Sequence, residues 1–135
     1  RWPQYFTPTR LVPEKLIREH FCSTPSPQLI QHEWEKHGTC MTKLPADYFA
    51  RSSKLFGDLR VPDMDKLSGT TMTAQAFQEA FAAANAGMRA DQMRLDVGRH
   101  GWLEEVWICL DKSFRPTTCP AHQRGAAPES SIRIR

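Results

Sequence analysis

The order of helical and strand patterns along the chain is what most restricts its fold. Segments with helical periodicity and capping residues fill the first two thirds, and alternating segments typical of strands follow. Helices that cluster before strands favour an α+β fold over repeated β–α–β units. The sequence predicts helices over 12–21, 26–37, 46–59 and 73–84, a loop over 60–69, and strands over 93–97, 102–110 and 132–135.

Length and composition set broad limits on the kind of protein. A chain of 135 residues favours one domain, with 40% hydrophobic and 24% charged residues as in ordinary globular proteins. The net charge of +3 and the pI near 8.8 mildly favour a polyanionic partner, although no basic run forms an electrostatic tail. No apolar run approaches the roughly 18 residues of a membrane-spanning helix, so we expect no membrane partner.

The most informative segment is His-Glu-Trp-Glu-Lys-His-Gly-Thr-Cys, which begins at His32. If it is helical, residues four apart are neighbours, so His32 lies beside Lys36 and Glu33 lies beside His37. Gly38 is well placed to end the helix in a left-handed C-cap. Histidines that titrate near neutrality, together with a lysine that stabilises negative charge, suit acid–base chemistry on an anionic substrate.

Three other readings of this segment remain open. A solvated charged face explains the charges, but not two histidines around a tryptophan. A histidine held in a core is credible for either histidine alone and poor for the pair. A zinc site is the third reading: His32 and His37 are five apart rather than the four of metalloproteases, but His37 and Cys40 could bind zinc with Cys22.

The nine-residue segment resembles the second active-site segment of the ribonuclease T2 family, the acid endoribonucleases that include bacterial periplasmic enzymes. Further likenesses lie at 25–30, 47–49 and 103–110, so the resemblance covers about residues 2–120. It implies an α+β fold with an antiparallel sheet packed against several helices. It also implies that residues 1–135 form a single ribonuclease-like domain.

One family segment is absent from the sequence. Members carry an earlier His-Gly-Leu-Trp-Pro segment with the second acid–base histidine, whereas here no histidine precedes His20. Trp2-Pro3-Gln4 resembles either its tail or a later Trp-Pro stretch, and the following Tyr5-Phe6 favours the latter. We expect a domain that lacks its N-terminal strand region, whether trimmed, proteolysed or degenerate. A companion N-terminal segment or chain could complete the active site.

The resemblance implies cleavage of single-stranded RNA without a metal or cofactor, through a 2′,3′-cyclic phosphate to a 3′-phosphate. It gives His37 an acid–base role, for which we favour the base, and gives His32 a phosphate contact. Glu33 and Lys36 would support the charged transition state. The alternative is a catalytically impaired homologue or fragment that acts as an RNA-binding or protein-binding module. A metal-dependent hydrolase is a more distant alternative.

Four residues before the catalytic segment match the family's pocket for the base 3′ to the cut. They are Pro25, Ser26, Gln28 and Leu29. For Ser26 a simple helix cap is the competing interpretation.

The four cysteines fall into two local pairs. In a domain that resembles exported enzymes, an even count predicts two disulfides and a secreted or periplasmic protein. Three connectivities are open, of which we favour Cys22–Cys40 with Cys109–Cys119. Four reduced thiols in a cytosolic protein are the alternative.

Overall fold

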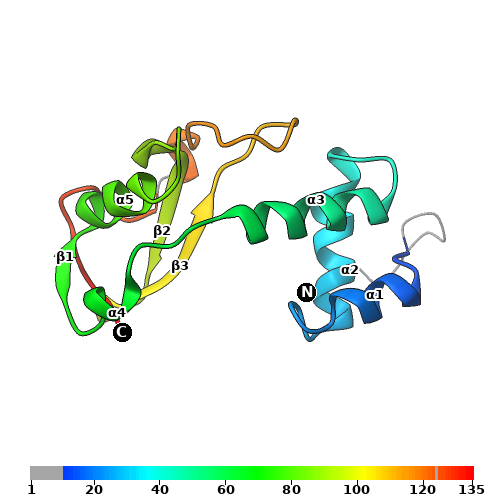
Figure 1. The fold of residues 1–135 in the computed structure, drawn as a ribbon, viewed down its shortest axis with the longest axis horizontal. Coiled ribbons are helices and arrows are strands. Elements are labelled where there is room, and N and C mark those ends of the chain that lie inside the picture. The colour runs from blue at the N-terminus through cyan, green and yellow to red at the C-terminus, as the bar shows by residue number, and fades with distance from the viewer. Residues whose placement is uncertain (1–10, 124) are drawn as a thin grey trace. The chain divides into compact units, whose positions relative to one another are not determined.

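The computed structural model describes residues 11–123 and 125–135, so the Trp2-Pro3-Gln4 and Tyr5-Phe6 resemblances lie outside the described residues. The chain divides into two compact units, unit 1 up to Asp58 and unit 2 from Leu59. Helices dominate unit 1, and short antiparallel strands pack with helices in unit 2 (Figure 1). The predicted α+β class is confirmed.

Unit 1 is a small helical assembly. It contains α1 (Glu14–His20), α2 (Pro27–Lys36), the 3₁₀ helix η2 (Gly38–Cys40) and α3 (Pro45–Asp58). All three predicted α-helices are confirmed to within a few residues. Their shared core consists of one or two apolar side chains from each helix and the residue that leads into α1: Val12, Leu16, Ile30, Trp34 and Phe49.

A buried polar contact joins the segment before α1 to α2. The backbone N–H of Val12 donates to the side-chain oxygen of Gln31 over 2.8 Å. Gln31 is only 8% exposed, so this bond satisfies a donor and an acceptor that burial removes from water. The contact fixes how the chain enters α1 relative to α2.

Unit 2 holds two separate two-stranded antiparallel sheets. In one, β1 (Thr71–Thr73) pairs with β4 (Ser131–Arg133), with Met72 opposite Ile132. In the other, β2 (Met93–Val97) pairs with β3 (Leu103–Ile108), with Leu95 opposite Val106. The unit also contains α4 (Met64–Leu67), α5 (Ala74–Ala83) and the 3₁₀ helices η3 (Ala90–Gln92) and η4 (Ala121–Gln123).

The core of unit 2 lies between α5 and the strands. Phe77 and Phe81 from α5 meet Met93 and Leu95 from β2, together with Ile132 from β4. Each is at most 4% exposed, and full burial of such a side chain contributes about 1.5–3 kcal/mol. The predicted helix over 73–84 and the predicted strand over 93–97 are confirmed.

Two elements of unit 2 differ from the prediction. The predicted loop over 60–69 contains α4, which Asp63 starts by accepting a hydrogen bond from the N–H of Lys66 over 3.3 Å. β1 was not predicted, because a three-residue strand is too short to show an alternating pattern. It forms because β4 supplies its hydrogen-bonding partner.

One of the two predicted disulfides is present. Cys109 and Cys119 are bonded, with Cα atoms 5.3 Å apart. The prediction of a Cys22–Cys40 bond is wrong, because both residues are free and exposed. The ten residues of α2 lie between them.

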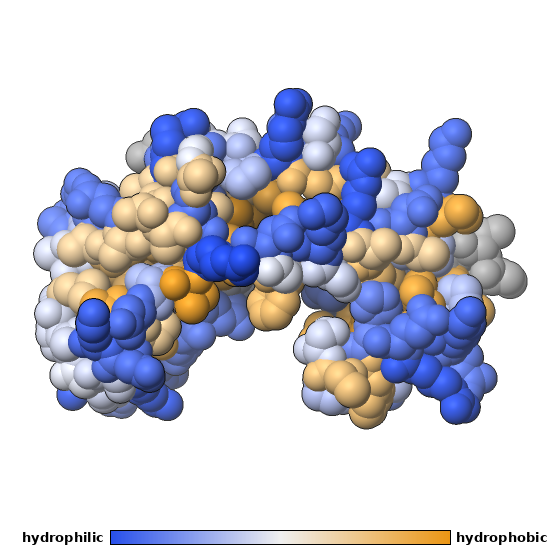
Figure 2. Space-filling view, viewed as in Figure 1, coloured by the Kyte–Doolittle hydropathy of each residue, from blue (hydrophilic) through white to orange (hydrophobic). Residues whose placement is uncertain are grey.

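Apolar side chains reach the surface of both units, among the hydrophilic ones on the face in Figure 2. Phe56, whose spacing in α3 favours the core, is instead 78% exposed. Trp107 is 49% exposed, as expected for a residue on the outer face of its strand. No helix within 11–123 or 125–135 combines the length and apolar character needed to cross a bilayer.

Candidate active site

The candidate site is built on α2, whose ends are set by local sequence. Ser26 precedes the helix in an extended conformation, and its hydroxyl accepts a hydrogen bond from the N–H of Leu29 over 3.2 Å. Pro27 occupies the first helical position, where a missing N–H costs nothing. Ser26 therefore caps α2 and sets where the helix begins.

Gly38 does not form the left-handed cap that the sequence predicts. The chain continues into η2 instead, and Gly38 is buried. A Cβ atom on Gly38 would lie 2.3 Å from Cε3 of Trp34 and 3.0 Å from Cδ1 of Tyr48. Glycine is thus needed because the indole packs directly on the backbone at the end of α2.

Replacing Gly38 with alanine should lower the free energy of unfolding by about 1–3 kcal/mol, because the added methyl group forces Trp34 out of its packed position. Urea unfolding followed by tryptophan fluorescence measures this loss. Gly57→Ala is the matched control, since no atom lies within 4 Å of its added Cβ. The control should be neutral or stabilising by about 0.5–1 kcal/mol. Equal effects would contradict the packing role of Gly38.

Glu33 and His37 lie side by side at the end of α2, as predicted. A carboxylate oxygen of Glu33 is 4.0 Å from Nε2 of His37, and their side chains are 40% and 49% exposed. The backbone N–H of His37 also donates to the carbonyl of Glu33 over 3.0 Å. The imidazole is therefore held beside an anionic group and remains open to a substrate.

His32 and Lys36 occupy the adjacent row of the helix. They are four residues apart on α2, so both side chains leave the same face. Lys36 is exposed, and His32 is partly buried. Two potential cations therefore lie in the row next to the Glu33–His37 pair. This arrangement suits the binding of an anionic substrate.

The predicted base-pocket residues lie at the opposite end of α2. Helix spacing aligns Gln28 with His32, about 6 Å apart along the axis, and aligns Leu29 with Glu33. The side chain of Leu29 is 41% exposed although it is apolar. Pro25 is exposed just before Ser26. The predicted base pocket thus lies at the start of α2 and the predicted catalytic residues lie towards its end. The rows Gln28–His32 and Leu29–Glu33 run from one set to the other.

Tyr48 on α3 approaches the site from another helix. Burial raises the pKa of Tyr48 above its ordinary value of 10.0, and the charge of Glu33 raises it further, whereas a hydrogen bond with Ser52 lowers it. The phenol therefore stays neutral near Glu33 at physiological pH. The sequence places Tyr48 only within the resemblance at 47–49, because helical spacing does not reveal which residue of α3 faces α2.

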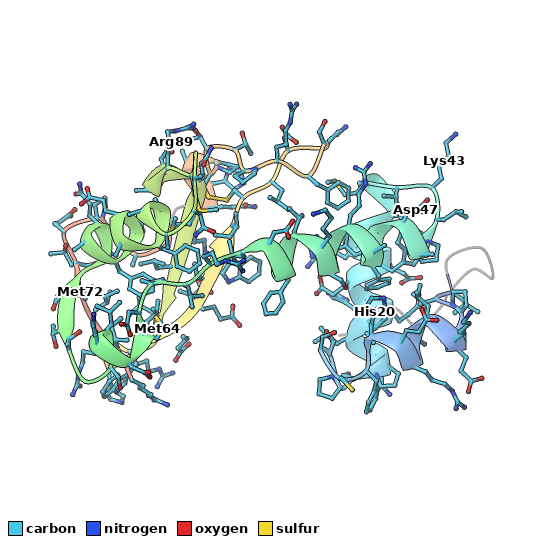
Figure 3. The ribbon with its side chains drawn as sticks, in the orientation of Figure 1. His20, Lys43, Asp47, Met64, Met72 and Arg89 are labelled. Carbon is cyan, nitrogen blue, oxygen red and sulfur yellow. A yellow bond between two sulfur atoms is a disulfide. The ribbon has the colours of Figure 1, made fainter. Side chains whose placement is uncertain are left out.

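A cavity of about 590 Å³ opens in unit 1 beside Glu33 and Tyr48. His20 lies at the end of α1 (Figure 3). It lines the same cavity. Its ring lies 5.3 Å from the ring of Phe49, and its Nδ1 is 3.4 Å from the hydroxyl of Ser53. These contacts hold the imidazole of His20 against α3.

The residues of the open zinc interpretation do not gather. Within the described ranges, no group of three or more histidine, cysteine or acidic side chains is arranged to hold a metal ion. Cys22 lies before α2 and Cys40 after it, so the helix separates them.

The family model and the curated relatives that match this chain are all ribonucleases. A model of the ribonuclease T2 family matches residues 11–119. A probable ribonuclease of Haemophilus influenzae is 31% identical over 108 residues, which cover 80% of this chain and 35% of that protein. A ribonuclease of Aeromonas hydrophila is 31% identical over 124 residues, with 82% and 56% covered.

A third relative, ribonuclease Oy of Magallana gigas, is 29% identical over 124 residues, with 81% of this chain and 58% of the relative covered. The chain thus spans between about a third and three fifths of the length of these relatives. No solved structure matches it.

Proposed function

The chain belongs to the ribonuclease T2 family, and from that premise we propose that it serves as an endoribonuclease domain for single-stranded RNA. The reaction is a transesterification that forms a 2′,3′-cyclic phosphate and releases the 5′-oxygen, followed by hydrolysis in which water opens the cyclic phosphate at the 2′-oxygen and leaves a 3′-phosphate. The observation that carries the proposal is the Glu33–His37 pair at the exposed end of α2, inside the segment that the family model matches.

RNA supplies its own nucleophile, so the site needs acid–base groups and cations rather than a nucleophilic side chain. His37 accepts the proton of the ribose 2′-hydroxyl while that oxygen attacks phosphorus. The 5′-oxygen leaves and takes a proton from a general acid. Glu33, 4.0 Å from the imidazole, orients His37. His32 and Lys36 neutralise the charge that develops on the phosphate oxygens.

We assign recognition of the base 3′ to the cut to Pro25, Ser26, Gln28 and Leu29. The alignment of Gln28 with His32 supports this, because it sets a hydrogen-bonding side chain about one helical turn before the residue that we propose to contact phosphate. The exposed side chain of Leu29 offers an apolar surface for a base.

The general acid is proposed to come from a companion segment with the family's His-Gly-Leu-Trp-Pro motif. Both units belong to one ribonuclease domain in this proposal. The family match supports it, because residues 11–119 include parts of unit 1 and unit 2. The Cys109–Cys119 bond supports an oxidising location, which we propose to be the periplasm or the exterior of the cell.

The test is an RNA cleavage assay on the chain preceded by a His-Gly-Leu-Trp-Pro segment. We expect cleavage in EDTA, cyclic phosphate ends in the first products, and no cleavage of DNA, which lacks the 2′-hydroxyl. The 135-residue chain without that segment should be slower by about 10²–10⁴-fold, the usual contribution of one acid–base group. Activity that chelation abolishes, or equal cleavage of DNA, refutes the proposed mechanism.

A further inference from the structure

An arginine–tryptophan cluster lies in unit 2, away from α2 in the sequence. It consists of Trp102, Arg133 and Arg135. The guanidinium carbons of Arg133 and Arg135 lie 4.1 Å and 5.1 Å from the centre of the indole ring of Trp102. Both arginines are exposed, because Ile132 and Ile134 alternate with them and point into the core.

The backbone fixes this cluster in place. Trp102 and Arg133 form a parallel bridge, and the N–H of Arg133 donates to the carbonyl of Gly101 over 2.7 Å. The aliphatic part of Arg133 also passes within 4 Å of the position where Gly101 would carry a Cβ. The indole therefore holds two cationic groups that would otherwise move freely, which lowers the entropy lost when they bind a ligand.

A second arginine–tryptophan pair in the same unit differs from the cluster in having acidic partners. Arg94 lies 5.0 Å from the ring centre of Trp107, but its Nε donates to Asp96 over 2.9 Å. The indole N–H of Trp107 donates to Glu105 over 2.7 Å. Acidic residues thus neutralise this pair.

In contrast, neither Arg133 nor Arg135 forms an ion pair with any carboxylate of the described chain. Each guanidinium carries five N–H donors in a planar fork that matches two oxygens of a phosphate. Two such groups on one indole form a preorganised, unneutralised binding surface for anions.

We propose that the arginine–tryptophan cluster of unit 2 binds phosphates of single-stranded RNA, in addition to the phosphate contacts proposed for His32 and Lys36. The inference rests on the proposed function, in which RNA is the polyanionic substrate of the domain. Phosphate contacts supply affinity without reading sequence, so the cluster would retain RNA of any sequence near the domain.

The test measures binding without cleavage. The probe is a short fluorescein-labelled 2′-O-methyl oligouridylate, which has no free 2′-hydroxyl, and its affinity for the 135-residue chain is followed by anisotropy over a range of salt concentrations. Each lost phosphate contact lowers the salt slope by about 0.7 for a single strand. The Arg133→Gln/Arg135→Gln variant should therefore lose about 1.4 in slope, or about 25-fold in affinity near 0.1 M salt.

Three further variants make the result specific. Arg133→Lys/Arg135→Lys keeps both charges and should restore the slope, although without the planar fork the affinity should stay lower. Trp102→Leu should weaken binding and leave the slope unchanged, because it frees the arginines without removing charge. Arg94→Gln is the matched control and should bind as the parent does, because Asp96 already neutralises Arg94.

An unchanged slope in the double glutamine variant overturns the proposal, as does an equal loss in Arg94→Gln or the absence of binding by the parent. Equal displacement of the probe by a polyglutamate peptide of the same charge also overturns it, in favour of an acidic protein partner. Failure of the proposed function is distinct. It would show as no RNA cleavage by the extended chain, whereas the slope is measured on an uncleavable probe.

Discussion

A chain extended by the His-Gly-Leu-Trp-Pro segment should lose about 10²–10⁴-fold in kcat when His37 is replaced by alanine. The imidazole of His37 is the group that takes the 2′-hydroxyl proton in the proposed reaction. Glu33 lies 4.0 Å from it, and the other histidine of this helix, His32, leaves α2 on a different row. Single-turnover cleavage of a fluorescent RNA measures the chemical step directly.

His32→Ala in the same extended chain is the matched control. His32 is proposed to contact phosphate, so its loss should raise KM and leave measurable turnover. The positive charge of Lys36, one turn further along the same row, still attracts the phosphate. Equal losses of kcat in the two variants would contradict this division of roles. So would full activity of His37→Ala.

The second large effect concerns the Cys109–Cys119 bond. Replacing both cysteines with alanine should lower the free energy of unfolding by about 2.5–3 kcal/mol, the value the loop-entropy model gives for a separation of 10 residues. Cys119 is 4% exposed, so the loss of its packed sulfur adds to the effect. Urea unfolding under non-reducing conditions provides the measurement.

Cys22→Ser/Cys40→Ser serves as the control for the disulfide. Both residues are free and exposed, so the change should stay within about 0.5 kcal/mol. Addition of a reductant should destabilise this control as strongly as the double alanine substitution destabilises the parent. A control variant that loses as much stability without reductant would show that Cys22 and Cys40 are bonded to each other in solution.

The parts of the fold that depend on neighbours in sequence could be predicted. The start of α2 follows from Ser26 and Pro27, and the Glu33–His37 contact follows from a spacing of four on a helix. Strand β2 shows its alternation within five residues. In each case the interaction that decides the structure lies within a few residues.

The parts that depend on distant residues could not be predicted. The space beside Gly38 is closed in part by Tyr48 on α3, 3.0 Å from where a Cβ would lie, and nothing near Gly38 in sequence indicates this contact. The position of Tyr48 beside Glu33 depends on how α3 packs against α2. The Cys22–Cys40 prediction was wrong for the related reason that closeness in sequence was taken for closeness in space, although a helix separates the two residues.

The pairing of β1 with β4 has a consequence for how the protein is made. Thr71 lies opposite Arg133, so this sheet closes a loop of about 60 residues, and β4 must emerge from the ribosome before β1 has a partner. The helices of unit 1 are close in sequence and can pack while synthesis continues. During translation, unit 2 therefore stays open to proteases and chaperones longer than unit 1 does.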